Sequence, residues 1–203
     1  MKKKSSRPRG RPRTFDRDQV LDRAVTTFWT KGYDGTSLDD LTENMGINRP
    51  SLYAAFGNKH ELYLEVINRY AATLGCRPVK AFDGEPDIKK AVAAFLETAI
   101  RCVTTKNGPK GCLCANVAVG DAENDEQVRN LLSEMFAKGN QVVAEFFHAA
   151  QELGQLPKGS DPCAMARMTI SMTHSFAIRA RVGASRDELS QLGRDFLAVL
   201  LPS

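Results

Sequence analysis

The sequence predicts an all-α protein, and three observations point to this fold class. Apolar residues recur along most of the chain at the three- and four-residue spacing of amphipathic helices. Residues that cap helices stand before these stretches, and glycines follow several of them. No useful length alternates between apolar and polar residues, as a half-buried strand would. With 203 residues, 42% of them hydrophobic, the chain suits one or two domains with a buried core.

Four helices are predicted in the first 75 residues, each bounded by its own start and stop signals. The signals in chain order are Asp16 with Gln19 to Gly32, Ser37 to Gly46, Asn48 to Gly57, and Asn58 with Glu61 through Leu74. The second and third helices are short and are joined by Gly46 and Ile47. Two short helices in this arrangement indicate a helix-turn-helix unit.

The rest of the chain is predicted to be helical after an irregular link over residues 76–86. The predicted segments are an amphipathic helix that begins at Ile88 and ends near Asn107-Gly108-Pro109, a short helix over 112–119, a long helix capped by Asn124 and Gln127 and closed by Gly154, a helix from Pro162 to about Val182, and a last helix over about 186–201 with a capping box at Ser185 and Glu188.

Positive charge is concentrated at the amino end. Residues 1–13 carry a charge of +7 with no acidic residue, while the remaining 190 residues sum to −3. A basic arm on a near-neutral body is typical of nucleic-acid binding, and a solubilising tail is the alternative. This composition predicts a disordered arm. Within it, Arg9-Gly10-Arg11-Pro12 is similar to the core of an AT-hook, so Arg9 and Arg11 are expected in a narrow minor groove, with non-specific attraction as the alternative.

The third predicted helix has the features of a recognition helix. Leu52 and Phe56 share one face and are expected in the core, which directs Arg49, Pro50 and Tyr53 outward. Arg49 would reach a guanine edge or a phosphate, Pro50 would make apolar base contact, and Tyr53 would bond a phosphate oxygen. In the alternative, Tyr53 packs on the fourth helix and Arg49 faces water.

Further DNA contacts are predicted where helices begin, because free N–H groups there attract phosphate. Lys59 lies in the first turn of the fourth helix, and its ammonium adds positive charge. These positions would hold the protein on the DNA backbone without reading the base sequence. The other expected contacts at helix starts and in the preceding turn are Tyr33, Thr36, Ser37, Asn48 and Ser51.

These motifs resemble the DNA-binding domain of the tetracycline-repressor (TetR) family. The resemblance covers Thr14 to Tyr70, including Gly32-Tyr33-Asp34-Gly35-Thr36-Ser37 and Met45-Gly46-Ile47-Asn48-Arg49-Pro50-Ser51-Leu52-Tyr53. After the basic arm over 1–13, it implies a DNA-binding domain over 14–70, joined by its fourth helix to a ligand-binding and dimerisation domain over 71–203. It also implies a homodimeric repressor that binds a palindromic double-stranded operator. A small-molecule inducer would release this repressor from the operator. Residues 111–116 also resemble a Gly-Cys-Leu-x-x-Asn element of some family members.

The resemblance places an inducer pocket among the central helices and a dimer interface on the last two. For each of these residues the alternative is ordinary core. The expected pocket residues are Phe95, Cys102, Asn116, Phe147, Met168, Met172 and Phe176. The expected interface residues are Met165, Leu189, Leu192, Phe196 and Leu200.

Five cysteines, an odd number, are expected to be reduced thiols. Cys112 and Cys114 lie next to Lys110 near a predicted helix start, and both features lower a thiol pKa. This pair suggests a second hypothesis, a regulator that senses oxidants or electrophiles, while two small helical residues remain the plain alternative. No further ligands stand at a spacing that completes a metal site, so no metal is expected.

The remaining motif search is negative. No Walker loop, Rossmann fingerprint, nucleophile elbow or zincin motif occurs, so neither an enzyme nor a cofactor is expected. No apolar run reaches the ~18–20 residues of a membrane span, and a cytoplasmic protein is predicted. An architectural DNA-binding protein without a ligand is a third hypothesis.

Overall fold

Helices dominate the computed structural model, which describes residues 15–75, 77–106 and 108–202. Within these residues there are nine α-helices and no strands, which confirms the predicted fold class. The helices are α1 (Arg17–Lys31), α2 (Leu38–Met45), α3 (Arg49–Phe56), α4 (Lys59–Tyr70), α5 (Ile88–Val103), α6 (Val119–Asp121), α7 (Glu126–Glu152), α8 (Pro162–Arg181) and α9 (Arg186–Leu200). Two π-helical turns, η1 (Ala71–Gly75) and η3 (Cys114–Ala118), and a 3-10 turn, η2 (Val79–Phe82), complete them. The predicted arm, with Arg9 and Arg11, lies outside the described residues.

The first four helices begin at polar caps and, for α1 to α3, end at glycines. Each predicted cap accepts hydrogen bonds from backbone N–H groups of the following turn: Asp16, Ser37, Asn48 and Asn58. At Asp16 the cap is one-sided, because among the described residues the Gln19 side chain does not bond back. Gly57 has a φ of +73°, and a Cβ there would lie 1.8 Å from the Glu61 carboxylate, so the turn from α3 into α4 favours glycine.

Three predicted boundaries need correction. Helix α5 ends at Val103, with Thr104 as its C-cap, several residues before the stop predicted near residues 107–109. Asp125, not Asn124, caps α7. Both residues have capping side chains, but Asp125 also contacts His60 of α4 at 2.6 Å, and this tertiary contact selects the cap. The fourth helix changes at Tyr70 from α to π geometry and continues as η1 to Gly75, instead of running as an α-helix through Leu74.

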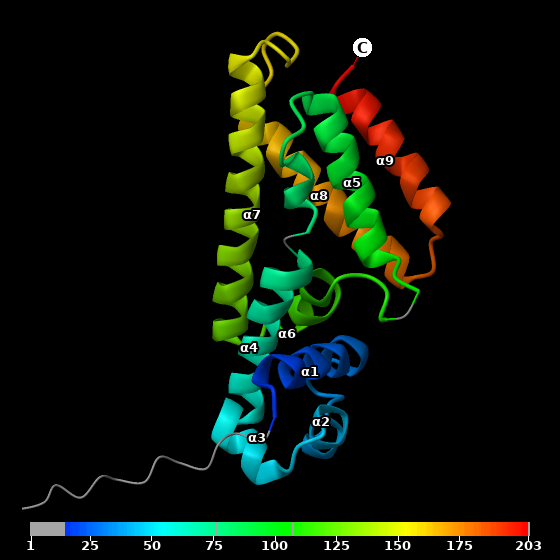
Figure 1. Ribbon diagram of the computed structural model, residues 1–203. Helices are drawn as coiled ribbons and strands as arrows, with labels where there is room; N and C mark the ends of the chain where they lie inside the picture. The colour runs from blue at the N-terminus through cyan, green and yellow to red at the C-terminus, as the bar shows by residue number, and fades with distance from the viewer. Residues whose placement is uncertain (1–14, 76, 107, 203) are drawn as a thin grey trace, which may run out of the picture.

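The second half of the chain is a helical bundle stacked beyond α4 (Figure 1). α5 packs against α8 and α9, and α7 packs along α8. Phe95, Phe147 and Phe176 are fully buried in its core. The short helix predicted over 112–119 is instead the π-turn η3 followed by the single turn of α6. In the part of the chain that the structure describes, no helix combines the length and apolarity needed to cross a membrane.

The helix-turn-helix region shares its core with the segment that follows α5. Phe28 and Leu62 of the first four helices belong to the same buried cluster as Leu113, Val128 and Leu132. Helix α4 therefore packs on both halves of the molecule, and the boundary at residue 70 is not a break in packing.

Candidate DNA interface and ligand cavity

The outer edge of α3 is exposed, as a recognition helix requires. Leu52 and Phe56 are buried against the other helices, whereas Arg49 and Pro50 are exposed and Tyr53 is 48% exposed. This placement follows from helical spacing, because residues 52 and 56 lie one turn apart on the core side. The amino end of α3 and its three predicted DNA-contacting side chains are exposed on the side that would enter a groove, and Arg49 is paired there with Asp39 of α2.

The predicted phosphate contacts around α2 and α4 are only partly available. Lys59 lies with its Nζ 4.3 Å from the centre of the Tyr33 ring, a cation–π contact that holds the ammonium near the start of α4. Thr36 was a wrong prediction: it is 1% exposed, and its hydroxyl donates to the Gly32 carbonyl at 2.6 Å. Burial and this bond leave Thr36 no contact with phosphate.

Ser37 and Asn48, two further predicted DNA contacts, are exposed, but both side chains also cap helices. Ser37 is exposed, but its hydroxyl is shared with Asp40 in the capping box of α2. Bonds from Lys31 and Ser37 lower the pKa of Asp40 to about 2. Asn48 is exposed and accepts the N–H of Ser51, so its carboxamide caps α3.

Three side-chain contacts tie α4 to the second half of the molecule. The Tyr63 hydroxyl donates to Asp121 of α6 at 2.5 Å, and burial with this bond raises the pKa of Tyr63. His60 lies 2.6 Å from Asp125 at the start of α7. Near the end of α4, burial and the neighbouring Cys112 side chain raise the pKa of Tyr70. Contacts along its whole length therefore make the position of α4 depend on the second half.

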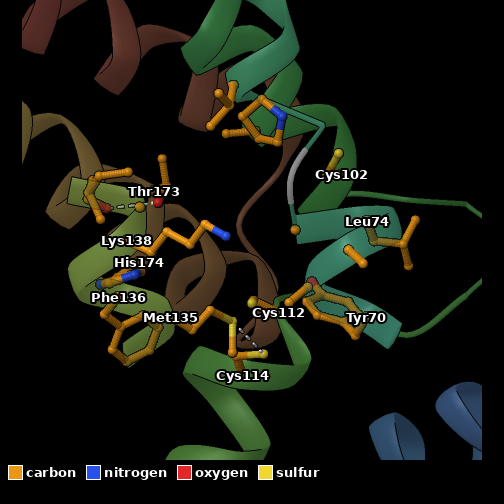
Figure 2. Close-up of a pocket in the computed structure, with 18 of the residues that line it drawn as sticks. Tyr70, Leu74, Cys102, Cys112, Cys114, Met135, Phe136, Lys138, Thr173 and His174 are labelled. Atoms are coloured by element: carbon orange, nitrogen blue, oxygen red, sulfur yellow. Dashed lines mark hydrogen bonds between the residues drawn. The ribbon is translucent and has the colours of Figure 1, made fainter. Parts of the chain in front are cut away.

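A cavity of about 730 Å³ lies between α4 with η1, α5, α7 and α8. Its volume falls within the range of small-molecule sites, ~300–1,000 Å³. Figure 2 shows side chains from α4, η1, α5, α7 and α8 around it, with Cys112 and Cys114 in the lower part of the view and Cys102 at the upper right. Residues that line it include Tyr70, Leu74, Cys102, Cys112, Cys114, Met135, Phe136, Lys138, Thr173 and His174.

The predicted pocket set requires correction, because of its seven residues only Cys102 lines the cavity. Three members are core residues with 0–1% exposure: Phe95, Phe147 and Phe176. Met168 is 49% exposed on the surface. The half-buried Met172 packs against the core of the helical bundle without lining the cavity. The Asn116 carboxamide oxygen accepts the Cys112 N–H at 2.7 Å, so Asn116 holds the turn before η3. Sequence spacing predicts which face of a helix points inward, but it does not show where space remains between packed helices.

Gly111 and Asn116 explain the Gly-Cys-Leu-x-x-Asn element. Gly111 has a φ of +87°, and a Cβ there would lie 2.3 Å from the Asn116 oxygen. Only glycine allows the carboxamide to approach this closely. The element therefore positions Cys112 at the cavity wall.

The two thiols of η3 and its approach are coupled. A hydrogen bond from Cys114 lowers the pKa of Cys112 to about 6. The same bond and burial raise the pKa of Cys114. Cys114 Sγ also lies 3.9 Å from Met135 Sδ. No group of three or more His, Cys, Asp or Glu side chains in the described residues is arranged to hold a metal.

Three of the five predicted interface residues are buried within the single chain. Leu189 is 1% exposed, Met165 6% and Leu200 8%, so within one chain their side chains are already covered. Leu192 and Phe196 are half-buried against the same core. Leu192 and Phe196 keep part of their surface exposed, so they stay predicted interface residues. The large exposed apolar side chains on or next to these two helices are Met168, Ile178, Val182 and Val199.

Comparisons with known proteins agree with this architecture. A family model described as bacterial regulatory proteins, tetR family, matches residues 20–66, and one described as a tetracyclin repressor-like C-terminal domain matches residues 89–196. The HTH-type transcriptional repressor ComR of Escherichia coli (strain K12) is 33% identical over 185 residues, 91% of this chain and 88% of ComR. The HTH-type transcriptional repressor BdcR of the same organism is 32% identical over 149 residues, 73% of this chain and 68% of BdcR.

A solved structure is also similar. The TetR-family transcriptional regulator CifR, a cysteine mutant complexed with 26-bp double-strand operator DNA, superposes with a TM-score of 0.84 at 33% identity, covering 92% of this chain and 98% of CifR. An exposed recognition edge within a helix-turn-helix unit, joined to a helical bundle, defines a DNA-binding transcription regulator. The chain belongs to the TetR family of such regulators, which bind DNA and are not enzymes.

Proposed function

We propose that this protein is a homodimeric repressor that binds a near-palindromic operator and leaves it when a small-molecule inducer fills the cavity. The observation that carries the proposal is that α4 belongs to both sites. Its first residue, Lys59, lies beside the DNA-facing edge, and its last residue, Tyr70, lines the cavity. A ligand that changes the cavity thereby acts on the helix that supports α3.

On DNA, residues 14–70 of each copy are proposed to read one half-site. Arg49 and Pro50 would contact base edges, while Lys59 and Tyr53 would contact phosphates. The arm over residues 1–13 would add minor-groove contacts through Arg9 and Arg11. Two half-sites about 34–36 Å apart would require two copies, joined through residues 71–203. The operator complex of the relative CifR supports this use of the fold.

Release requires an inducer that binds better to a conformation with misplaced recognition helices. Helix α4 would transmit such a change, because His60 and Tyr63 bond to the second half and Tyr70 lines the cavity. A coupling free energy of ~1–3 kcal/mol would lower operator affinity about 5–150-fold.

The test is selection of bound sequences from random double-stranded DNA, followed by displacement of the selected operator with small molecules. We expect a two-fold symmetric operator and release by at least one cavity ligand. Val142→Phe should fill part of the cavity, so the ligand concentration needed for operator release should rise about tenfold. The matched Ala137→Phe, at an exposed position of α7 outside the cavity, should respond normally. Sequence-independent binding with no ligand response would instead favour an architectural protein.

A second candidate function, sensing of oxidants or electrophiles, is favoured by one observation. Cys112 and Cys114 both line the cavity, and their hydrogen bond favours the Cys112 thiolate, the reactive form of a thiol. Under this alternative, Cys112→Ser and Cys114→Ser abolish release by peroxide or quinone. Release that persists in both variants rejects thiol sensing and leaves a non-covalent inducer.

A further inference from the structure

We infer that the cavity takes an amphipathic carboxylate, an apolar acid whose head group is bound by Lys138 and His174. This inference rests on the proposed function, since it specifies the chemical class of the inducer. It is carried by the distribution of apolar, cationic and hydrogen-bonding side chains around the cavity.

The walls favour an apolar body. Most of the lining side chains are hydrocarbon or sulfur-bearing, and they come from η1, α5, α7 and α8. They include Leu74, Ala99, Val103, Leu131, Val142 and Ile170. Burying apolar surface against such walls contributes about 25 cal/mol per Å² before the costs of association are subtracted. A purely polar ligand would lose its hydration without this compensation.

The cationic group favours an anionic head. Lys138 of α7 is an exposed residue at the border of the cavity, and its side chain extends toward the cavity in Figure 2. Within the described residues no carboxylate lies within 4.0 Å of its ammonium, although Glu134, one turn earlier on α7, also lines the cavity. Lys80 is a second cation in the lining, so the two lysines outnumber the one acid. A ligand carboxylate would complete the ion pair that Lys138 lacks.

His174 adds a hydrogen-bonding group on the adjoining wall. Its ring packs on Phe136 with centroids 4.9 Å apart, and among the described residues its nitrogens have no hydrogen-bond partner. Burial lowers its pKa and so favours the neutral ring, which carries one N–H donor. Lys138 and His174 lie on neighbouring helices on the same side of the cavity (Figure 2). Together they supply donors for a head group, while the apolar walls enclose the tail.

The experiment compares matched acid and amide probes that differ in charge but hardly in shape: decanoate with decanamide, and a naphthoate with its naphthamide. Binding to the full chain is measured by calorimetry, and operator release by fluorescence anisotropy. We expect each carboxylate to bind about tenfold or more tightly than its amide, the range of a charge-assisted bond. Lys138→Gln should abolish this preference, Lys138→Arg should retain it, and the exposed Lys90→Gln on α5 should leave it intact.

Equal binding of acids and amides, with release by both, overturns the carboxylate inference while the ligand-responsive repressor stands. A preference that survives Lys138→Gln also overturns it, because the head group would then bind elsewhere. Failure of all four probes to bind overturns the inference as well. The proposed function fails by a different result, namely an operator that no cavity ligand displaces.

Discussion

At the scale of single residues, Arg49 on the exposed edge of α3 already has an acidic partner, which DNA would have to replace. The Arg49 guanidinium pairs with the Asp39 carboxylate of α2 at 2.7 Å, and both side chains are well exposed. An exposed pair of this kind contributes ~0–1 kcal/mol, less than a good bidentate contact with guanine, ~1–3 kcal/mol. Arg49 is therefore expected to exchange Asp39 for DNA when the operator binds.

Substitutions of Arg49 and Lys59 separate reading of bases from attraction to the backbone. Arg49→Ala should cost about 1–3 kcal/mol on the operator and relax base preference, whereas Lys59→Ala should weaken operator and random DNA alike and reduce the salt dependence. Affinities measured by anisotropy across a salt series test both. Asp39→Asn is the control and should retain base preference. Equal losses on both DNAs for Arg49→Ala would contradict its assigned role.

The Cys112 thiol, which lines the cavity, should titrate at a lower pH than a free thiol. Because the interaction with Cys114 lowers the pKa of Cys112, the ultraviolet absorbance of its thiolate should rise with a midpoint below the ~8.5 of a free thiol. Cys114→Ala removes the donor and should move the midpoint upward. The difference between wild-type and Cys112→Ser spectra isolates the signal. A wild-type midpoint at the free-thiol value would reject the assignment.

At the scale of elements, local signals and tertiary contacts share control of the helices. α2 and α4 begin at reciprocal capping boxes formed within four residues. Near the cavity, two helices adjoin π-turns instead of ending at a cap of this kind. Helix α4 passes into the π-turn η1, and α6 is preceded by the π-turn η3. π-turns are rare and frequently occur at functional sites, and both of these contribute to the cavity wall.

Helix α8 carries a group whose titration should reduce stability in acid. Burial lowers the pKa of His174, so below about pH 6.5 the unfolded chain takes up this proton more readily than the folded one. Stability should therefore fall as pH decreases through this range, by at most ~1.4 kcal/mol per pH unit from this group. Denaturant unfolding of wild type and His174→Phe measures it. The variant should show the shallower decline, and parallel curves would contradict the prediction.

At the scale of the whole molecule, two copies must present their recognition helices together. The exposed apolar residues Ile178 and Val199 lie on α8 and α9 and are 53% and 78% exposed in the single chain. Isolated exposed residues are common, but here they lie on the two helices that the family resemblance assigns to the interface.

Charges at these two positions should dissociate the proposed homodimer. We expect Ile178→Asp with Val199→Asp to sediment as a monomer and to lose most of its operator affinity, because each monomer reads only one half-site. Leu153→Asp, at a position 70% exposed just beyond α7, is the matched control and should remain dimeric. A double variant that stays dimeric would place the interface elsewhere.

Some of the site could be predicted from the sequence because the relevant spacing is local. Arg49, Pro50 and Tyr53 lie within five residues, and helical geometry alone separates them from the buried Leu52. Thr36 was misassigned because its side chain is buried and its hydroxyl donates to the Gly32 carbonyl, four residues earlier in the chain. Local spacing does not show which of two acceptors a hydroxyl takes.

The cavity was not predictable in this way. It lies between residues far apart in sequence, such as Tyr70, Lys138 and His174, which come from α4, α7 and α8. Periodicity identifies the inward face of a helix, but a side chain on that face can fill the core, as Phe147 does, or border a gap.

The amino-acid sequence by itself determined the helical class, the helix-turn-helix unit and its exposed edge, because caps, glycine stops and apolar spacing act over a few residues. Tertiary structure alone decided which side chains surround the cavity, which thiol is ionised more easily and which apolar residues remain on the surface. Those properties depend on how helices distant in sequence pack, and close packing leaves space only where side-chain volumes from several elements fail to fill it.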